Sequence, residues 1–281
     1  MAGQARRRLD SELVRRRLAR SREQAVELIA AGRVSVGGQR AAKAATQVET
    51  SAAIVVAQAA DGAEPGYASR GGHKLAGALE AFGAGPEGLL VAGRRALDAG
   101  ASTGGFTDVL LRAGARQVVA VDVGYGQLVW ELRNDPRVVV VDRTNVRELT
   151  LDQIGGEPVE LVVGDLSFIS LTLVLPALVR CAVPEADLAL MVKPQFEVGR
   201  ERLGTGGVVR DTALHAEAVR TVAGAAAGLG LGVRGVTASP LPGPSGNVEY
   251  FLWLRAGAPP LREQDLVRAV AEGPAGAGGR D

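Results

Sequence analysis

The sequence predicts an α/β protein in which a seven-stranded, mostly parallel sheet follows a small α+β module. Two patterns carry this prediction. From residue 94 onward, short Val-rich runs alternate with helical stretches, which is typical of parallel strands joined by helical crossovers. The first sixty residues instead combine two short helical patterns with strand-and-turn patterns. A chain of 281 residues has room for one small and one medium domain.

The first module, residues 8–60, begins with helical spacing and ends with strands. Leu9, Leu13 and Val14 recur at helical intervals, and Ser21 with Gln24 three residues later predicts a capped start for a second helix. The run "RVSVGGQR" predicts a strand and a tight turn, and "AAIVVA" predicts another strand.

Formal charge is distributed unevenly along the chain. Residues 1–60 contain eleven Lys or Arg against five Asp or Glu, whereas the other 221 residues contain 21 against 26. A locally basic segment is typical of proteins that bind a polyanion, because Lys and Arg release counterions from phosphates when they dock. On charge alone, a solvated helix face remains the alternative.

The stretch "RLARSREQAVELIAAGRVSVGG" resembles the S4 RNA-binding domain, in which basic helices and the following turn grip structured RNA. The resemblance covers residues 8–60, and it implies an RNA partner but no particular reaction. Judged by charge and position, the residues expected to contact phosphates are Arg15, Arg16, Arg20, Arg22, Arg33 and Lys43.

Residues 61–72 are predicted to be an interdomain linker, because they are rich in Gly, Ala and small polar residues and contain Pro65. Residues 73–256 are expected to form the second domain and residues 257–281 a C-terminal tail. The last eight residues, "PAGAGGRD", are expected to be disordered.

Seven runs in the second domain are expected to form strands. Five come first: "RALDAG", "QVVAVDV", "RVVVVDR", "VELVVGDL" and "LALMVKP". The last two, "GVRGVTASP" and "VEYFLWLR", are separated only by "LPGPSGN", which is too short for a helical crossover, so they are expected to pair antiparallel. Five parallel strands followed by such a hairpin is the Rossmann-like arrangement of class I methyltransferases.

The stretch "LDAGASTGGFTDVLL", residues 97–111, predicts a strand, a Gly-rich turn and a helix, the usual place for a nucleotide-like cofactor. A dinucleotide fingerprint aligned on Gly100 has Ser102 where its second glycine belongs, and the lysine of a phosphate-binding loop is missing after Gly105. Asp98, two residues before the first glycine, suits a cationic and hydroxyl-bearing ligand instead. S-adenosylmethionine is such a ligand.

Four successive strands end in Asp, at the edge of the sheet where ligands bind in open α/β folds. Asp122 is placed to accept ribose hydroxyls, and Asp142 is placed to meet an adenine amino group. The residues expected to bind the cofactor are Asp98, Gly100, Ser102, Thr103, Gly104, Gly105, Phe106, Asp122, Asp142 and Asp165.

The chain contains only three lysines, and two of them, Lys74 and Lys193, belong to the second domain. Unlike arginine, a lysine side chain can lose its proton inside a protein. With Asp165 and Glu249, these lysines resemble the Lys-Asp-Lys-Glu tetrad of FtsJ-like ribose 2′-O-methyltransferases.

Together with the S4 module, the motifs "SRGGHKL", "DVGYGQL", "MVKPQFEVG" and "SPLPGPSGNVEYFLWL" resemble the TlyA family over residues 8–256. The resemblance implies 2′-O-methylation of cytidine in the ribosomal RNA of both subunits. It implies that Lys193 activates the 2′-hydroxyl, that Asp165 and Lys74 set its protonation and position, and that Glu249 orients the acceptor.

Three alternatives remain: an NAD oxidoreductase, an RNA chaperone with a silent methyltransferase fold, and the membrane-active protein that the family's haemolysin label suggests. No apolar signal opens the chain, and its longest uncharged apolar run, residues 166–179, is shorter than the roughly 18 residues that cross a bilayer. The single cysteine, Cys181, excludes an intramolecular disulfide. We expect a cytoplasmic monomer that binds ribosomal RNA, with no membrane partner and no metal site.

Overall fold

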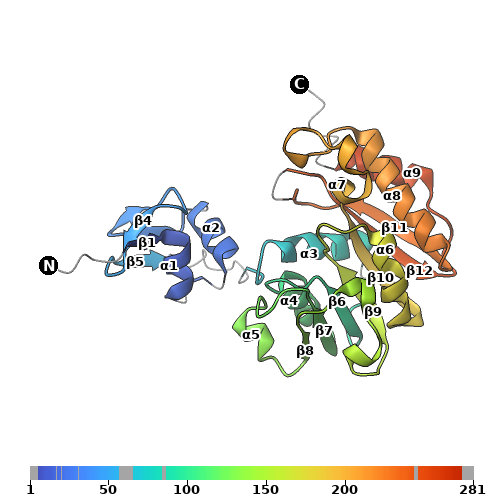
Figure 1. Ribbon diagram of the computed structural model, residues 1–281, viewed down its shortest axis with the longest axis horizontal. Coiled ribbons are helices and arrows are strands. Elements are labelled where there is room, and N and C mark those ends of the chain that lie inside the picture. Colours follow the sequence, from blue (N-terminus) through green and yellow to red (C-terminus); the bar gives the residue numbers. More distant parts are fainter. Residues whose placement is uncertain are drawn as a thin grey trace. The chain divides into compact units, whose positions relative to one another are not determined.

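The structure is a computed structural model that describes residues 6–16, 18–19, 21–30, 32–56, 66–83, 87–243 and 246–273. The chain divides into two compact units, Met1–Arg70 and Gly71–Asp281, which we call unit 1 and unit 2 (Figure 1). The first five residues of the predicted linker, 61–65, and the predicted disordered end, 274–281, lie outside the described residues.

Unit 1 has the α+β character that its sequence predicts. Its described elements are β1 (Arg6–Arg8), α1 (Leu9–Arg15), α2 (Arg22–Ala30), β2 (Val34–Val36), β3 (Gln39–Arg40), β4 (Gln47–Glu49) and β5 (Ile54–Val56). β1 pairs with β4, and β2 pairs with both β3 and β5, all antiparallel. The sequence alone did not indicate the β1–β4 pair, which joins segments about forty residues apart.

Local signals in unit 1 act as expected. The backbone N–H of Gln24 donates to Oγ of Ser21 at 3.1 Å, which confirms the predicted cap of α2. Gly37 and Gly38 form the turn between β2 and β3 with φ of +57° and +80°. The buried core of the unit consists of Leu9, Leu13, Ala19, Ala25, Ile29, Val34 and Val48.

Unit 2 is built on a seven-stranded sheet with the order β11-β12-β10-β9-β6-β7-β8. Its strands are β6 (Arg95–Ala99), β7 (Gln117–Val121), β8 (Val138–Val141), β9 (Val159–Gly164), β10 (Ala182–Val192), β11 (Leu231–Ala238) and β12 (Tyr250–Ala256). β6 to β10 pair in parallel, whereas β12 runs antiparallel to β10 and β11. The predicted sheet is therefore confirmed, including the antiparallel pairing of its last two strands.

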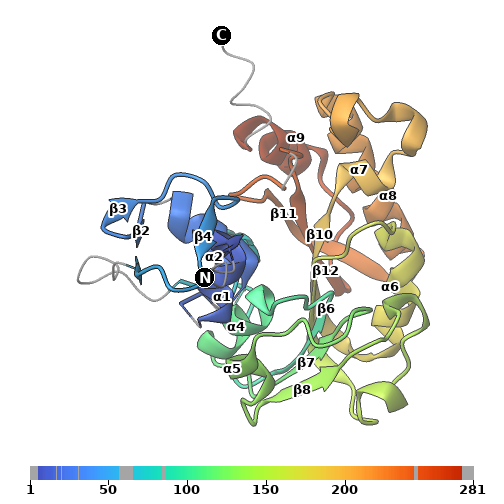
Figure 2. The same ribbon diagram turned by 60° about the vertical axis from the view of Figure 1, so that its left-hand side comes forward.

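Helices cover both faces of this sheet. Figure 2 shows α6 (Leu171–Arg180) and α8 (Thr212–Ala227) on one side and α4 (Gly105–Arg112) and α5 (Trp130–Arg133) on the other. The other helical elements in the described residues are α3 (Gly71–Phe82), α7 (Pro194–Glu197), α9 (Glu263–Glu272) and the short 3-10 turns Val146–Glu148, Asp152–Ile154, Arg200–Arg202 and Thr205–Gly207. None of the helices in these ranges is long and apolar enough to cross a membrane.

Two helices extend beyond the boundaries that the sequence predicts for the second domain. α3 begins at Gly71, inside the predicted linker, and its Leu75 and Ala78 are fully buried. α9 lies in the predicted tail, where Leu266 is fully buried and the helix packs against β11 and α8. Both helices gain apolar contacts from segments far away in the sequence, so composition near their ends gave little indication of them.

Candidate active site

The loop between β6 and α4 runs along the carboxyl edge of the sheet and is shaped by two glycines. Gly100 and Gly104 have φ of +85° and +99°, a region that side chains disfavour. A β-carbon on Gly100 would lie 2.8 Å from the backbone oxygen of Asp165, and one on Gly104 would lie 2.4 Å from a methyl carbon of Leu132. Only glycine fits at both positions, as in loops whose backbone approaches a ligand closely.

The other predicted cofactor residues of this loop divide into two kinds. Ser102 is exposed and Thr103 is half-buried, so both present side chains at the loop surface. Gly105 and Phe106 are buried, and the Phe106 ring stacks on Phe251 with a centroid distance of 5.9 Å. Phe106 therefore supports the loop from the core.

Asp98, at the end of β6, has an incompletely satisfied buried carboxylate. Its side chain is fully buried, and Oδ2 accepts a 2.7 Å hydrogen bond from Oγ1 of Thr107. Oδ1 has no hydrogen-bond partner among the described residues. Burial raises the pKa of Asp98 to about 7, against the opposing effect of the Thr107 hydrogen bond and with a contribution from the charge of Asp165. A buried acceptor without a partner is rare in proteins and suits a ligand donor.

Asp122 and Asp142 lie at the ends of β7 and β8 and organise the neighbouring loops. Asp122 accepts hydrogen bonds from the backbone N–H of Ser102 at 2.8 Å and of Gly124 at 2.7 Å, one on each oxygen. Asp142 accepts from Nη1 of Arg133 at 2.9 Å through Oδ2. A carboxylate has about four acceptor positions, so these contacts leave capacity for a ligand hydroxyl or amino group.

Strand register brings the predicted tetrad to the same edge. Leu190 of β10 lies opposite Gly164 of β9, and Val192 of β10 lies opposite Tyr250 of β12. Asp165 follows Gly164 directly, Lys193 follows Val192, and Glu249 directly precedes Tyr250 in the antiparallel strand. Lys74 is contributed by α3.

The four side chains form two lysine–carboxylate pairs. Nζ of Lys74 donates to Oε2 of Glu249 at 2.5 Å, and these residues are 6% and 1% exposed. Nζ of Lys193, 8% exposed, lies 2.6 Å from Oδ1 of Asp165. Buried charges require such partners, so each pair depends on both of its members. Among the described residues, no group of three or more His, Cys, Asp or Glu side chains could hold a metal ion.

Sequence reasoning missed a second polar contact of Lys193. Its Nζ donates a 3.0 Å hydrogen bond to Oγ of Ser167, two residues after Asp165. The next residue, Phe168, has φ of +65° and is 91% exposed, and its ring lies 5.2 Å from that of Phe196. An exposed aromatic ring held in this rare conformation, near the buried lysine, marks this segment as part of the site.

In unit 1, buried carboxylates organise several predicted phosphate-binding arginines. Arg15 and Arg16 both contact Glu12, at 2.6 and 2.7 Å. Arg16 also donates to the backbone oxygens of Thr50 and Ala52, and its side chain is only 21% exposed. Arg16 is therefore bound internally, whereas Arg15 remains 48% exposed.

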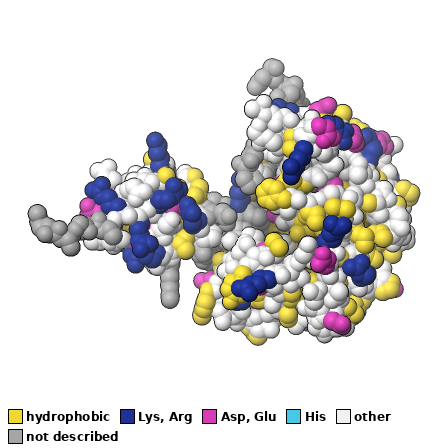
Figure 3. Space-filling view, in the orientation of Figure 1, with side chains coloured by type: hydrophobic (Ala, Val, Ile, Leu, Met, Phe, Trp, Pro, Cys, Tyr) yellow, Lys and Arg dark blue, Asp and Glu magenta, His cyan; other side chains and the backbone are white. Residues whose placement is uncertain are grey.

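The remaining predicted RNA-binding residues differ in exposure. Arg22 is 61% exposed and contacts Asp10, which also binds Arg8, a residue that the sequence alone did not single out. Lys43 is exposed and Arg33 is half-buried, while Arg20 lies outside the described residues. On the face shown in Figure 3, Lys and Arg outnumber acidic side chains on unit 1.

Comparisons with known proteins agree with this architecture. The sequence pattern of the FtsJ-like methyltransferases matches residues 67–256, and that of the S4 domain matches residues 7–54. The chain is 59% identical over 272 residues to the 16S/23S rRNA (cytidine-2'-O)-methyltransferase TlyA of Mycobacterium tuberculosis, covering 95% of this chain and 98% of that protein.

Two further relatives carry a different name. Hemolysin A of Brachyspira hyodysenteriae is 36% identical over 231 residues, covering 82% of this chain and 92% of its own. A solved structure of a hemolysin-named protein from Streptococcus thermophilus is 36% identical, with a TM-score of 0.75 over 98% of this chain and 97% of that chain. The chain therefore belongs to the TlyA family, in which an S4 domain precedes an FtsJ-like methyltransferase domain.

Proposed function

We propose that this enzyme methylates the 2′-hydroxyl of cytidine in ribosomal RNA of the small and large subunits, with S-adenosylmethionine as methyl donor. The observation that carries the proposal is the two lysine–carboxylate contacts of buried lysines, Lys74–Glu249 and Lys193–Asp165, at the carboxyl edge of the sheet. The named activity of the relative from Mycobacterium tuberculosis, at 59% identity over nearly the full length, supports the same substrate.

The residues at the edge of the sheet fit this cofactor. Bound S-adenosylmethionine supplies an electrophilic methyl group on a sulfonium cation. Asp98, whose Oδ1 has no partner among the described residues, would accept a hydrogen bond from the donor end of such a ligand, and the close loop at Gly100 and Gly104 would let the ligand meet the backbone. Asp122 and Asp142 would bind its hydroxyl and amino groups. A negatively charged phosphate would be repelled by this row of carboxylates.

Lys193 is the residue we assign to the acceptor hydroxyl. Its Nζ is buried and is fixed by Asp165 and Ser167, so its position does not depend on the substrate. This role requires Nζ to be the neutral amine before the reaction. The hydroxyl proton then passes to Nζ as the 2′-oxygen attacks the methyl carbon, and Asp165 stabilises the resulting ammonium. Lys74, held by Glu249, adds positive charge near the developing oxyanion.

The RNA-binding part of the proposal rests on both units. The exposed arginines of unit 1, Arg15 and Arg22, suit phosphate contacts. Phe168, almost fully exposed beside Lys193, suits stacking with an unpaired base, which is how proteins usually recognise nucleotides outside a helix.

Mapping of ribose methylation tests the proposal. Unmodified ribosomal subunits are incubated with the full chain and S-adenosylmethionine, and 2′-O-methylated positions are located in the RNA. Wild-type protein should add the mark to cytidine, whereas Lys193→Ala should add none while retaining cofactor affinity in calorimetry. If wild-type protein modifies no ribose, the assignment is wrong; leakage of liposomes caused by the purified chain alone would favour the haemolysin alternative.

A further inference from the structure

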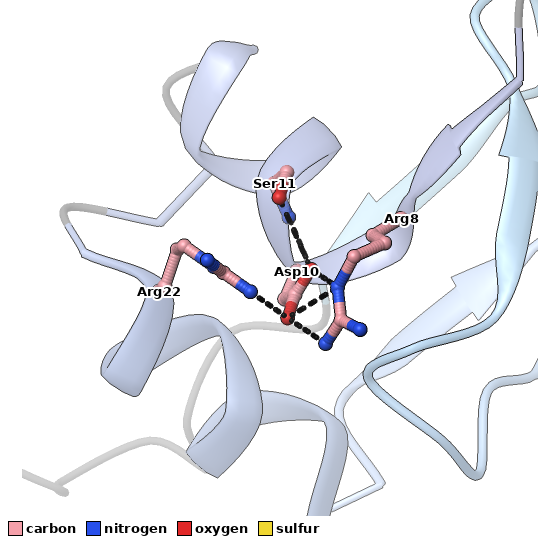
Figure 4. Close-up of polar contacts among 4 residues, drawn as sticks. All are labelled: Arg8, Asp10, Ser11 and Arg22. Carbon is pink, nitrogen blue, oxygen red and sulfur yellow. Dashed lines mark hydrogen bonds and ion pairs between the residues drawn. The ribbon is translucent and has the colours of Figure 1, made fainter.

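Asp10 is a buried carboxylate that gathers two arginines from different elements of unit 1 (Figure 4). Arg8, the last residue of β1, donates to Asp10 from Nε at 3.1 Å and from Nη2 at 2.7 Å. Arg22, the first residue of α2, donates from Nη2 at 3.1 Å, and the backbone N–H of Ser11 donates at 2.7 Å. The Asp10 side chain is only 2% exposed, so it lies beneath the two guanidinium groups.

The two arginines keep much of their surface. The Arg8 side chain is 45% exposed and the Arg22 side chain 61% exposed. Arg8 uses Nε and Nη2 for Asp10 and Arg22 uses only Nη2, so each has further N–H groups that take no part in this contact. The Arg8 hydrogen bond holds the pKa of Asp10 well below its usual range, with help from Arg22 and against the effect of burial, so the carboxylate stays ionised.

The second buried carboxylate of α1 shows that this arrangement is not a general property of the helix. Glu12 also contacts two arginines, but one of them, Arg16, donates further hydrogen bonds to the backbone oxygens of Thr50 and Ala52. The contacts of Arg16 with Glu12 and with these backbone oxygens therefore stabilise the fold of unit 1. No such backbone contact accompanies Arg8 and Arg22 in the described residues.

We propose that Asp10 is a positioning residue, which holds Arg8 and Arg22 as a fixed pair for one phosphate group of the RNA. This inference rests on the proposed RNA-binding function. An exposed arginine normally loses side-chain freedom when it binds, and an arginine already fixed by a carboxylate loses less. Two cations and one anion leave a net charge of +1, which complements the single negative charge of a phosphodiester. Guanidinium forks held in one orientation also match phosphate oxygens geometrically.

The first test is Asp10→Asn in the full chain, which keeps the size of the side chain and removes its charge. Binding to purified, unmodified ribosomal subunits should weaken about tenfold, or about 1.4 kcal/mol. The KM for subunits should rise by the same factor, with kcat and cofactor affinity unchanged. The matched control is Asp135→Asn, because Asp135 in unit 2 also accepts from Nε and Nη2 of an arginine two residues away, Arg137, although in the reverse chain order; it should bind like wild type.

A double-mutant cycle separates positioning from a general structural effect. In a chain carrying Arg8→Gln and Arg22→Gln, the further change Asp10→Asn should weaken binding by less than twofold, because the residues it positions are gone. A full tenfold loss in this background would overturn the inference, since Asp10 would then act on binding through other residues.

Lysine substitutions keep the inference testable if Asp10→Asn does not fold. Arg8→Lys with Arg22→Lys preserves the charge but removes the forked geometry, so binding should weaken about tenfold; wild-type affinity would overturn the inference. A wild-type chain that neither binds nor methylates the subunits contradicts the proposed function itself. An active wild type with an equally active Asp10→Asn variant, at equal KM, contradicts only the role of Asp10.

Discussion

Replacement of Asp98 by Asn should stabilise the cofactor-free protein, and the gain should grow with pH. The Asp98 carboxyl is fully buried, and one of its oxygens has no partner among the described residues. Burial is the main reason why its pKa rises from the ordinary value of 3.8 to about 7. An asparagine side chain has nearly the same shape, can still bond to Thr107, and does not titrate.

The sign and size follow from proton linkage. Between pH 3.8 and about 7 the folded state holds a proton on Asp98 that the unfolded state has lost, so stability of the wild type falls as pH rises through this interval. At about 1.4 kcal/mol for each pKa unit, the full interval corresponds to about 4 kcal/mol. About 3 kcal/mol of this should appear between pH 5 and pH 8 as a growing advantage of Asp98→Asn over wild type.

Urea unfolding of the cofactor-free chain, followed by tryptophan fluorescence, measures this difference. Both tryptophans, Trp130 and Trp253, belong to unit 2, and Trp253 is 3% exposed, so the signal reports the unit that contains Asp98. Asp135→Asn is the control: Arg137 lowers the pKa of Asp135, so this carboxyl is ionised in both states and its effect should stay constant from pH 5 to pH 8. A stability difference for Asp98→Asn that is also constant over this range would refute the reasoning.

Three further substitutions test the site. Lys74→Met leaves the carboxylate of Glu249 buried without its cation, so the free energy of unfolding should fall by about 3–5 kcal/mol. Adding Glu249→Gln should recover most of this loss, and no recovery in urea titrations would argue against the pair. Gly100→Ala should destabilise the protein by at least about 1–2 kcal/mol, because its φ is +85° and the new β-carbon would meet a backbone oxygen at 2.8 Å; thermal unfolding at the wild-type temperature would contradict the strain. Ser167→Ala removes the hydrogen-bond acceptor of Lys193 and should lower kcat for RNA methylation about tenfold with cofactor affinity retained; unchanged kcat would show that this bond does not position the amine.

The family membership and the site geometry oppose two of the three alternatives that the sequence left open. Membership of the FtsJ-like family opposes an NAD oxidoreductase, in agreement with Ser102 at the position of the second fingerprint glycine. The two complete lysine–carboxylate pairs argue against a silent methyltransferase fold, because buried charges are costly to keep without a use. Two relatives are named hemolysins, and the liposome leakage test with the purified chain decides whether this chain acts on membranes.

Local patterns predicted the fold well and the contacts within it poorly. The alternation of Val-rich runs with helical stretches is a repeated local signal, and it correctly indicated seven strands and the antiparallel pairing of the last two. Asp10 and Glu12 look like ordinary surface carboxylates in a charged segment, yet both are almost fully buried. Their burial depends on how α1 packs in unit 1, which no local pattern expresses. For the same reason, the sequence could not distinguish the internally bound Arg16 from the exposed Arg22.

By itself, the sequence determined the class of fold, the kind of cofactor loop and the basic character of the first module. These properties depend on periodicity, on glycine positions and on residues at strand ends, all of which act over a few neighbouring residues. Only the tertiary structure decided which carboxylate each cation contacts. Lys74 and Glu249 are 175 residues apart in the chain, and they meet because α3, which packs against α4 and β11, brings Lys74 to the start of β12. Which charged residues pair is decided by the packing of helices and strands, because the local sequence does not determine which distant strand lies beside a given helix.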